Sequence, residues 1–141
     1  PGGGGTRGRA HAAQPHEYAI AGYDELDASR LEDGAGLIDR VLDAAAPRSL
    51  RVVLISSLRD FADACDRRPE VVLRKVHTVA IQGGLVRSTA TESGWEPDTS
   101  VNNDFDPEAA KRMYSFCFSR GLRMTVTSRN AVPMLPMQLA K

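Results

Sequence analysis

The chain has 141 residues, of which 42% are hydrophobic and 26% charged, a composition typical of a soluble protein with one packed core. Basic and acidic residues number 18 each, and this neutral balance argues against a domain whose main partner is nucleic acid or an anionic membrane. No apolar run has the length of a membrane span and no signal-peptide pattern is present, so we expect a cytoplasmic protein unless an organelle-targeting segment was removed. The chain begins with proline rather than methionine, which indicates processing, trimming or a longer parent chain.

The first part of the chain contains two predicted regions. Residues 1–14 are rich in glycine and lack apolar periodicity, so we expect a flexible lead-in to a single α/β domain over residues 15–141. Ser29 and Glu32 have the spacing of a capping box, which predicts the start of a helix. Pro47 is expected to end that helix.

Three apolar segments, residues 51–57, 76–81 and 122–129, are predicted strands. Their runs of β-branched residues are typical of strands that are covered on both faces, as in a parallel sheet. Predicted helices alternate with these strands along the chain. This order predicts an α/β fold, with a mostly parallel sheet that has helices on both faces.

The helix predicted over residues 107–120 has the clearest end signals of the chain. Asp106 is expected to cap its first turn, and Pro107 takes the first helical position, where a missing N–H costs nothing. Gly121 stands where a helix end needs a left-handed residue.

Polar residues follow each predicted strand, and in a parallel sheet these carboxyl ends meet at one edge. Gln82, Gly83 and Gly84 follow the second strand, and a loop over residues 85–105, rich in Ser, Thr, Asn and Asp, comes next. Open α/β sheets bind their ligands at this edge, so we expect the binding site here. Gly83 and Gly84 equally fit a structural role in the turn between strand and loop.

Three sequence motifs in this region resemble those of the inosine/uridine-preferring nucleoside hydrolases. They are IQGG at residues 81–84, N-x-x-x-DPEAA at residues 102–110, and the glycine-led strand at residues 121–126. The resemblance extends over roughly residues 50–128 and implies a nucleoside hydrolase-like, open Rossmann-like fold, incomplete in this chain. It also implies hydrolysis of the N-glycosidic bond of ribonucleosides in purine and pyrimidine salvage, with calcium as cofactor. The implied partners are a nucleoside or related ribosyl compound and a homo-oligomer or larger protein assembly.

The resemblance implies substrate contacts by Asn102, Gln82, Asp98 and Asn103. Asn102 aligns with the asparagine that grips ribose, whereas a nearby glutamate of the family falls on Ser100. Gln82 replaces a methionine and is expected to place an amide at the floor of the pocket. Asn102 and Asn103 also fit a purely structural role as turn residues.

The family's amino-terminal D-x-D-x-x-x-D-D cluster, which supplies most calcium ligands and the catalytic base, does not occur in this sequence. We therefore assign no catalytic residue, and the one weak match to a calcium ligand is the main-chain carbonyl of Arg59. Asp106, Gly83 and Gly84 are expected to shape the site as a helix cap and a turn. Two hypotheses follow: a nucleoside N-ribohydrolase whose missing parts lie outside this chain, or a non-catalytic hydrolase-like domain, a pseudoenzyme, with an accessory role in a larger assembly.

Overall fold

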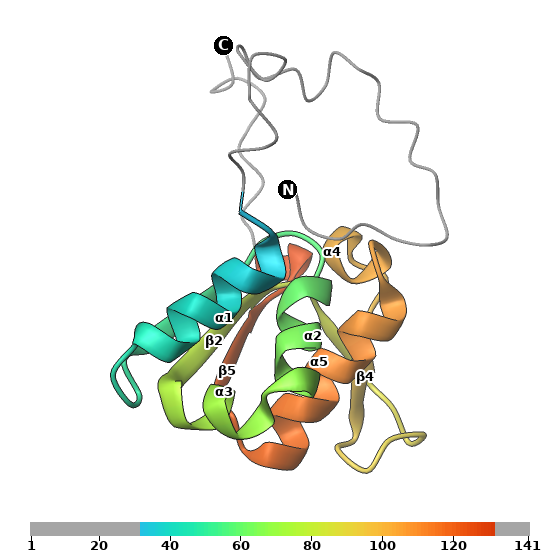
Figure 1. Cartoon of the computed structure of the whole chain (residues 1–141). Coiled ribbons are helices and arrows are strands. Elements are labelled where there is room, and N and C mark those ends of the chain that lie inside the picture. Colours follow the sequence, from blue (N-terminus) through green and yellow to red (C-terminus); the bar gives the residue numbers. More distant parts are fainter. Residues whose placement is uncertain (1–31, 132–141) are drawn as a thin grey trace, which may run out of the picture.

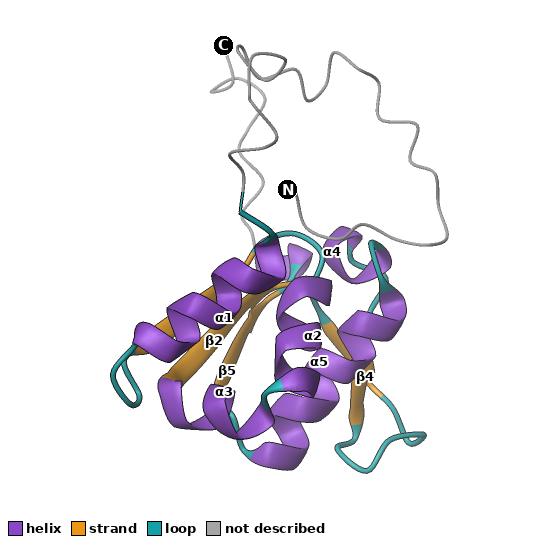
Figure 2. Cartoon of the chain, in the orientation of Figure 1, coloured by secondary structure: helices purple, strands orange, loops and turns teal. Residues whose placement is uncertain are grey.

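The computed structural model describes residues 32–131, in which helices and strands alternate along the chain (Figures 1 and 2). The lead-in predicted over residues 1–14 and the tail beyond Ala131 lie outside the described residues. Of the helices within residues 32–131, none combines the length and the apolar content that a bilayer crossing requires. The elements are, in order, α1 (Gly34–Ala44), β1 (Leu50–Leu54), α2 (Arg59–Arg67), α3 (Pro69–Lys75), β2 (Val76–Gln82), β3 (Leu85–Arg87), β4 (Trp95–Pro97), α4 (Val101–Asp104), α5 (Pro107–Arg120), β5 (Met124–Thr127) and the 3-10 helix η3 (Arg129–Ala131).

The main sheet has three strands in the order β1-β2-β5, and both pairings are parallel, as the sequence predicts. In its register, Val79 of β2 lies beside Val52 of β1 on one side and Met124 of β5 on the other. β1 ends at Leu54 rather than residue 57, because the chain turns there toward α2. β5 begins at Met124 and ends at Thr127, and is therefore shorter than predicted.

The described helices pack on the face of the sheet that carries the buried side chains of Val79 and Ile81 (Figure 1). Helices α2 and α5 lie against each other, and α1 and α3 pack against α2. The other face presents Val53, whose Cα partner on β2 is Ala80. In the described part of the chain, Val53 is 64% exposed. The α/β class, with a parallel sheet flanked by helices, is confirmed.

Helix α1 begins later than the sequence analysis predicts. Its N-cap is Asp33, whose Oδ2 accepts a hydrogen bond from the Gly36 amide over 3.0 Å. Glu32 precedes the helix and forms an ion pair with Arg40 across 2.6 Å. The predicted capping box was therefore wrong, because Glu32 lies outside the first turn; Ser29 itself lies outside the described residues.

Helix α5 has the ends that its sequence predicts. Asp106 Oδ1 accepts a hydrogen bond from the Ala109 amide over 3.1 Å, and Pro107 occupies the first turn. At the other end, Gly121 has a φ of 66°, in the left-handed region that glycine adopts without strain. The buried face of α5 forms much of the core and consists of Ala109, Ala110, Met113, Tyr114 and Cys117.

The long loop after β2 has more structure than the sequence analysis predicts. β3 and β4 pair as an antiparallel hairpin, and α4 forms one short turn of helix before α5. The Arg87 guanidinium of β3 lies 4.1 Å from the centre of the Trp95 ring of β4, a cation–π contact across the two strands. Strands of three residues are too short to show an alternating pattern, so the hairpin could not be predicted from local periodicity.

Candidate functional site

The carboxyl edge of the sheet brings Gln82 and Asn102 together. Gln82 ends β2, and the amide of the next residue, Gly83, donates to the Thr127 carbonyl of β5 over 3.1 Å. Asn102 lies on α4, and its Nδ2 donates to the Gln82 main-chain carbonyl over 2.8 Å. The Gln82 side chain is exposed and Asn102 is half-buried. Within the described residues, Asn102 Oδ1 has no hydrogen-bond partner, so it remains an acceptor at this edge.

Asn103 points into the protein instead. Its side chain is 1% exposed, and its Nδ2 donates to the Gly84 carbonyl over 2.9 Å and to Asp98 Oδ1 over 3.1 Å. Its Oδ1 accepts a hydrogen bond from the Tyr114 hydroxyl over 3.3 Å. Asn103 therefore fastens the end of β2, the loop and α5 to one another. A buried tyrosine on the following helix is the signal that the sequence analysis missed.

Asp98 also takes part in this buried junction. Its Oδ1 accepts hydrogen bonds from Asn103 Nδ2 and from the Ser100 amide, the latter over 2.9 Å. The Ser100 hydroxyl is buried and has no hydrogen-bond partner in the described part of the chain. The Asp98 carboxylate thus holds the loop by accepting hydrogen bonds from two N–H groups. Position 100 carries a serine, as the sequence shows, and not the glutamate that the resemblance would imply.

The glycine pair is required by close packing rather than by an unusual backbone conformation. A Cβ atom added to Gly84 would collide with the Asp98 carboxylate. One added to Gly83 would lie 2.5 Å from the Tyr114 hydroxyl oxygen and 2.9 Å from Asn103 Oδ1. Gly83 and Gly84 therefore make room for the junction beneath the candidate site.

Arg59 and Asp106 lie next to each other at the same end of the molecule. Arg59 Nε is 3.8 Å from Asp106 Oδ2 and 3.7 Å from Asp63 Oδ2. Asp106 thus both caps α5 and pairs with the first residue of α2. Among the residues 32–131, no group of three or more His, Cys, Asp or Glu side chains is placed to hold a metal ion.

The buried ionisable side chains of the core are held in their neutral forms. Burial raises the pKa of Tyr114 to about 12, so its hydroxyl keeps the proton that it donates to Asn103. Burial likewise raises the pKa values of Cys65 and Cys117 to about 12. Both thiols are therefore protonated and unreactive near neutral pH, which makes them structural rather than nucleophilic.

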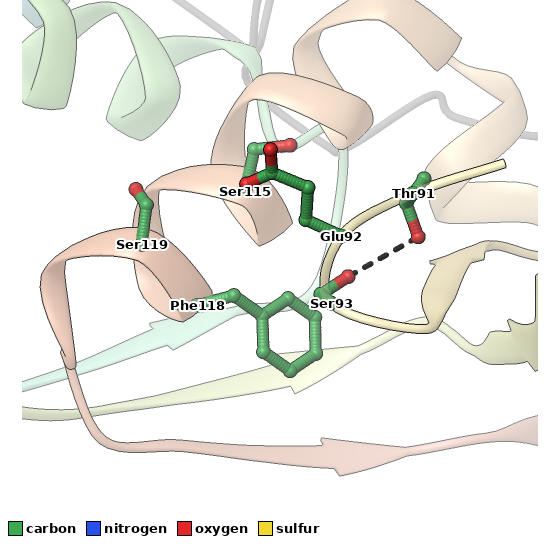
Figure 3. A pocket seen from close by; sticks show the side chains of 6 residues that line it. All are labelled: Thr91, Glu92, Ser93, Ser115, Phe118 and Ser119. Atoms are coloured by element: carbon green, nitrogen blue, oxygen red, sulfur yellow. Dashed lines mark hydrogen bonds between the residues drawn. The ribbon is translucent and has the colours of Figure 1, made fainter. Parts of the chain in front are cut away.

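Two clefts open beside the hairpin, and neither is lined by Gln82 or Asn102. One, of about 410 Å³, separates the hairpin loop from α5 (Figure 3). The other, of about 570 Å³, is lined by Arg87, Ser88, Thr89 and Gly94. The sequence analysis missed both because it did not predict the hairpin that forms their walls.

Comparisons with known proteins identify similar solved structures. No family model matches the sequence, and no curated protein matches it. The crystal structure of the type III effector protein XopQ complexed with adenosine diphosphate ribose is similar, with a TM-score of 0.63 and 24% identity. The effector protein XOO4466 is similar with a TM-score of 0.60 and 24% identity. Each match covers 69% of this chain and 27% of the other, so the chain spans about a quarter of their length.

These similarities show the fold alone: the matched part of the chain has the α/β fold of the corresponding part of the two effector proteins. The expected fold class is thereby confirmed. A preference for inosine or uridine, the hydrolytic activity and the calcium ion stay predictions.

Proposed function

We propose that this chain belongs to a nucleoside hydrolase-like protein and contributes a binding surface for a ribosyl compound. The observation that carries the proposal is the hydrogen bond from Asn102 Nδ2 to the Gln82 main-chain carbonyl, which holds Asn102 at the carboxyl edge of the sheet. Ligands of open α/β folds bind at this edge. The similar effector protein XopQ was crystallised with adenosine diphosphate ribose, which contains ribose, and this supports a ribosyl ligand.

The side-chain amides of Asn102 and Gln82 supply the contacts in this proposal. The Asn102 Nδ2 bond to the Gln82 carbonyl fixes the orientation of the Asn102 amide, so that Oδ1 is available to accept a hydrogen bond from a ribose hydroxyl. The Gln82 side chain is exposed beside it and adds one donor and one acceptor group. Asn103 and Asp98, whose polar atoms are engaged inside the protein, act as positioning residues.

Hydrolysis of an N-glycosidic bond is the activity that we propose for the complete protein. That reaction needs a base to activate water and polar groups to stabilise an oxocarbenium-like transition state. Asn102 and Gln82 fit the second requirement. Among the described residues, no group of three or more His, Cys, Asp or Glu side chains could hold a metal ion, and we assign no reaction step to this chain.

A non-catalytic accessory domain is the second candidate. The substitution of Ser100 for a glutamate and the missing aspartate cluster favour it. Both candidates predict ribosyl binding at the edge, and they differ in turnover. Release of free base from inosine, uridine or adenosine by the parent protein with calcium supports the hydrolase, whereas binding without base release supports the accessory domain.

Calorimetric titration of the 141-residue chain with adenosine diphosphate ribose tests the binding proposal. Asn102→Ala is expected to weaken binding about tenfold, which corresponds to the loss of one well-oriented hydrogen bond and its preorganisation. Thr89→Ala, an exposed change on the hairpin loop, is the matched control and should leave the affinity unchanged. Equal affinities for the Asn102→Ala variant and the unchanged chain would overturn the proposed site.

A further inference from the structure

The cleft between the hairpin loop and α5 has two walls of different chemistry (Figure 3). One wall is a stripe on α5 formed by Ser115, Phe118 and Ser119, which have the i, i+3, i+4 spacing of one helix face. The other is the loop segment over residues 91–93. At about 410 Å³, the cleft lies within the size range of small-molecule sites, which is roughly 300–1,000 Å³.

The loop wall presents hydrogen-bond acceptors. The Thr91 and Ser93 hydroxyls donate their protons to the Trp95 carbonyl, over 2.9 Å and 3.0 Å respectively. The Ser93 oxygen also accepts from the Trp95 amide over 3.3 Å, so the acceptor capacity of these two hydroxyls lies mainly at Thr91 Oγ1. Between them, the Glu92 carboxylate adds further acceptors, since it forms no ion pair or hydrogen bond within the described residues.

The helix wall presents free hydroxyls and an apolar ring. The side chains of Ser115 and Ser119 are exposed and have no hydrogen-bond partner in the described part of the chain, so each can donate and accept. Phe118, 36% exposed, extends its ring toward the loop below Ser93 (Figure 3). An exposed phenyl face between two serines offers an apolar platform flanked by polar groups.

The charges of the lining select among ligand classes. None of the six residues that line the cleft is cationic, and Glu92 is acidic, so phosphates and nucleotides are disfavoured. An amine would use the acceptors of the loop wall and leave the serine donors unused. A ring with several hydroxyls matches both walls, because each hydroxyl donates and accepts, while its C–H face packs on the phenyl ring.

We propose that this cleft is a binding site for a neutral carbohydrate, with Phe118 as the apolar platform and Glu92, Ser115 and Ser119 as hydrogen-bonding partners. The site is separate from the proposed ribosyl surface, since neither Asn102 nor Gln82 lines it. Failure of one proposal therefore leaves the other intact.

NMR titration of the 141-residue chain with maltotriose and with cellobiose, up to about 10 mM, tests the proposal, with spermidine and glucose 6-phosphate as charged comparisons. A neutral saccharide is expected to shift the amide resonances of residues 91–93 and 115–119. Phe118→Ala should weaken its binding about tenfold and Glu92→Gln severalfold, since the carboxamide keeps the shape and loses the charge. Thr89→Ala, which lies in the same loop but lines the other cleft, is the control and should bind normally.

Three outcomes would overturn the proposal. The first is the absence of shifts in both segments with either neutral saccharide. The second is unchanged saccharide binding in both Phe118→Ala and Glu92→Gln. The third is binding of spermidine at this cleft in place of saccharides, which would assign it to cationic ligands. Because Glu92 is exposed, its variant keeps the test informative even if Phe118→Ala folds poorly.

Discussion

Tyr114 of α5 donates a hydrogen bond to Asn103 of α4 over 3.3 Å, and both side chains are almost completely buried. Through the same amide group, Asn103 also bonds to the Gly84 carbonyl at the end of β2. One side chain thus connects the strand, the loop and the helix that form the candidate site. The position of Asn102, which immediately precedes Asn103 in the chain, depends on this junction.

Replacing Asn103 with alanine is expected to destabilise the protein by about 2 kcal/mol, because the change removes the acceptor of the buried Tyr114 hydroxyl and one of the two N–H donors to the Gly84 carbonyl, which keeps only the Asp98 amide. Urea unfolding gives this free energy. Asn102→Ala is the matched control, since it removes one exposed hydrogen bond and should cost no more than about 1 kcal/mol. Equal losses for the two variants would contradict the junction.

Gly84→Ala is expected to cost about 1–3 kcal/mol, because the added methyl group meets the Asp98 carboxylate and must displace it. Gly34→Ala is the control, since a Cβ atom there has no neighbour within 4 Å and helix α1 gains a better helix former. Thermal unfolding compares the two. A Gly84→Ala variant as stable as Gly34→Ala would show that the close approach of Asp98 is unimportant.

Alkaline pH is expected to destabilise the fold. The folded pKa of Tyr114, at about 12, exceeds its usual value of 10.0, and those of Cys65 and Cys117 rise from 9.0 to about 12. The unfolded chain therefore loses these protons first, so their contribution is complete below pH 9 and is lost as the pH rises toward 12. Each group contributes a slope of up to about 1.4 kcal/mol per pH unit.

Urea unfolding of the unchanged chain and of Cys65→Ala between pH 8 and pH 11 checks this dependence. The variant should be less stable at pH 8, because burial of the sulfur is lost, but its stability should fall less steeply above pH 9. A flat profile up to pH 11 for the unchanged chain would contradict the assigned burial of these groups.

The ends of α5 and the presence of strand β1 could be predicted from residues close to them in the sequence. Asp106, Pro107 and Gly121 mark the ends of α5, and the β-branched run of β1 indicates a strand, because each effect acts within a few residues. The start of α1 was misassigned because Asp33 and Ser29 are both good caps, and only packing decides between them.

The candidate site was predicted only in part, because it depends on contacts between distant residues. The end of the second predicted strand placed Gln82 at the carboxyl edge, and the resemblance added Asn102. The inward direction of Asn103 depends on Tyr114, eleven residues away, and on the Gly84 carbonyl. The hairpin depends on pairing between two three-residue strands, which no local pattern specifies.

Chemical-shift mapping of the isotope-labelled 141-residue chain with adenosine diphosphate ribose, at about 1 mM ligand, tests the central claim most directly. The account predicts shifts that concentrate on Gln82, Asn102 and Thr127, at the carboxyl edge of the sheet. Shifts confined to the hairpin clefts, or no shifts in any part of the chain, would contradict a ribosyl-binding surface at that edge.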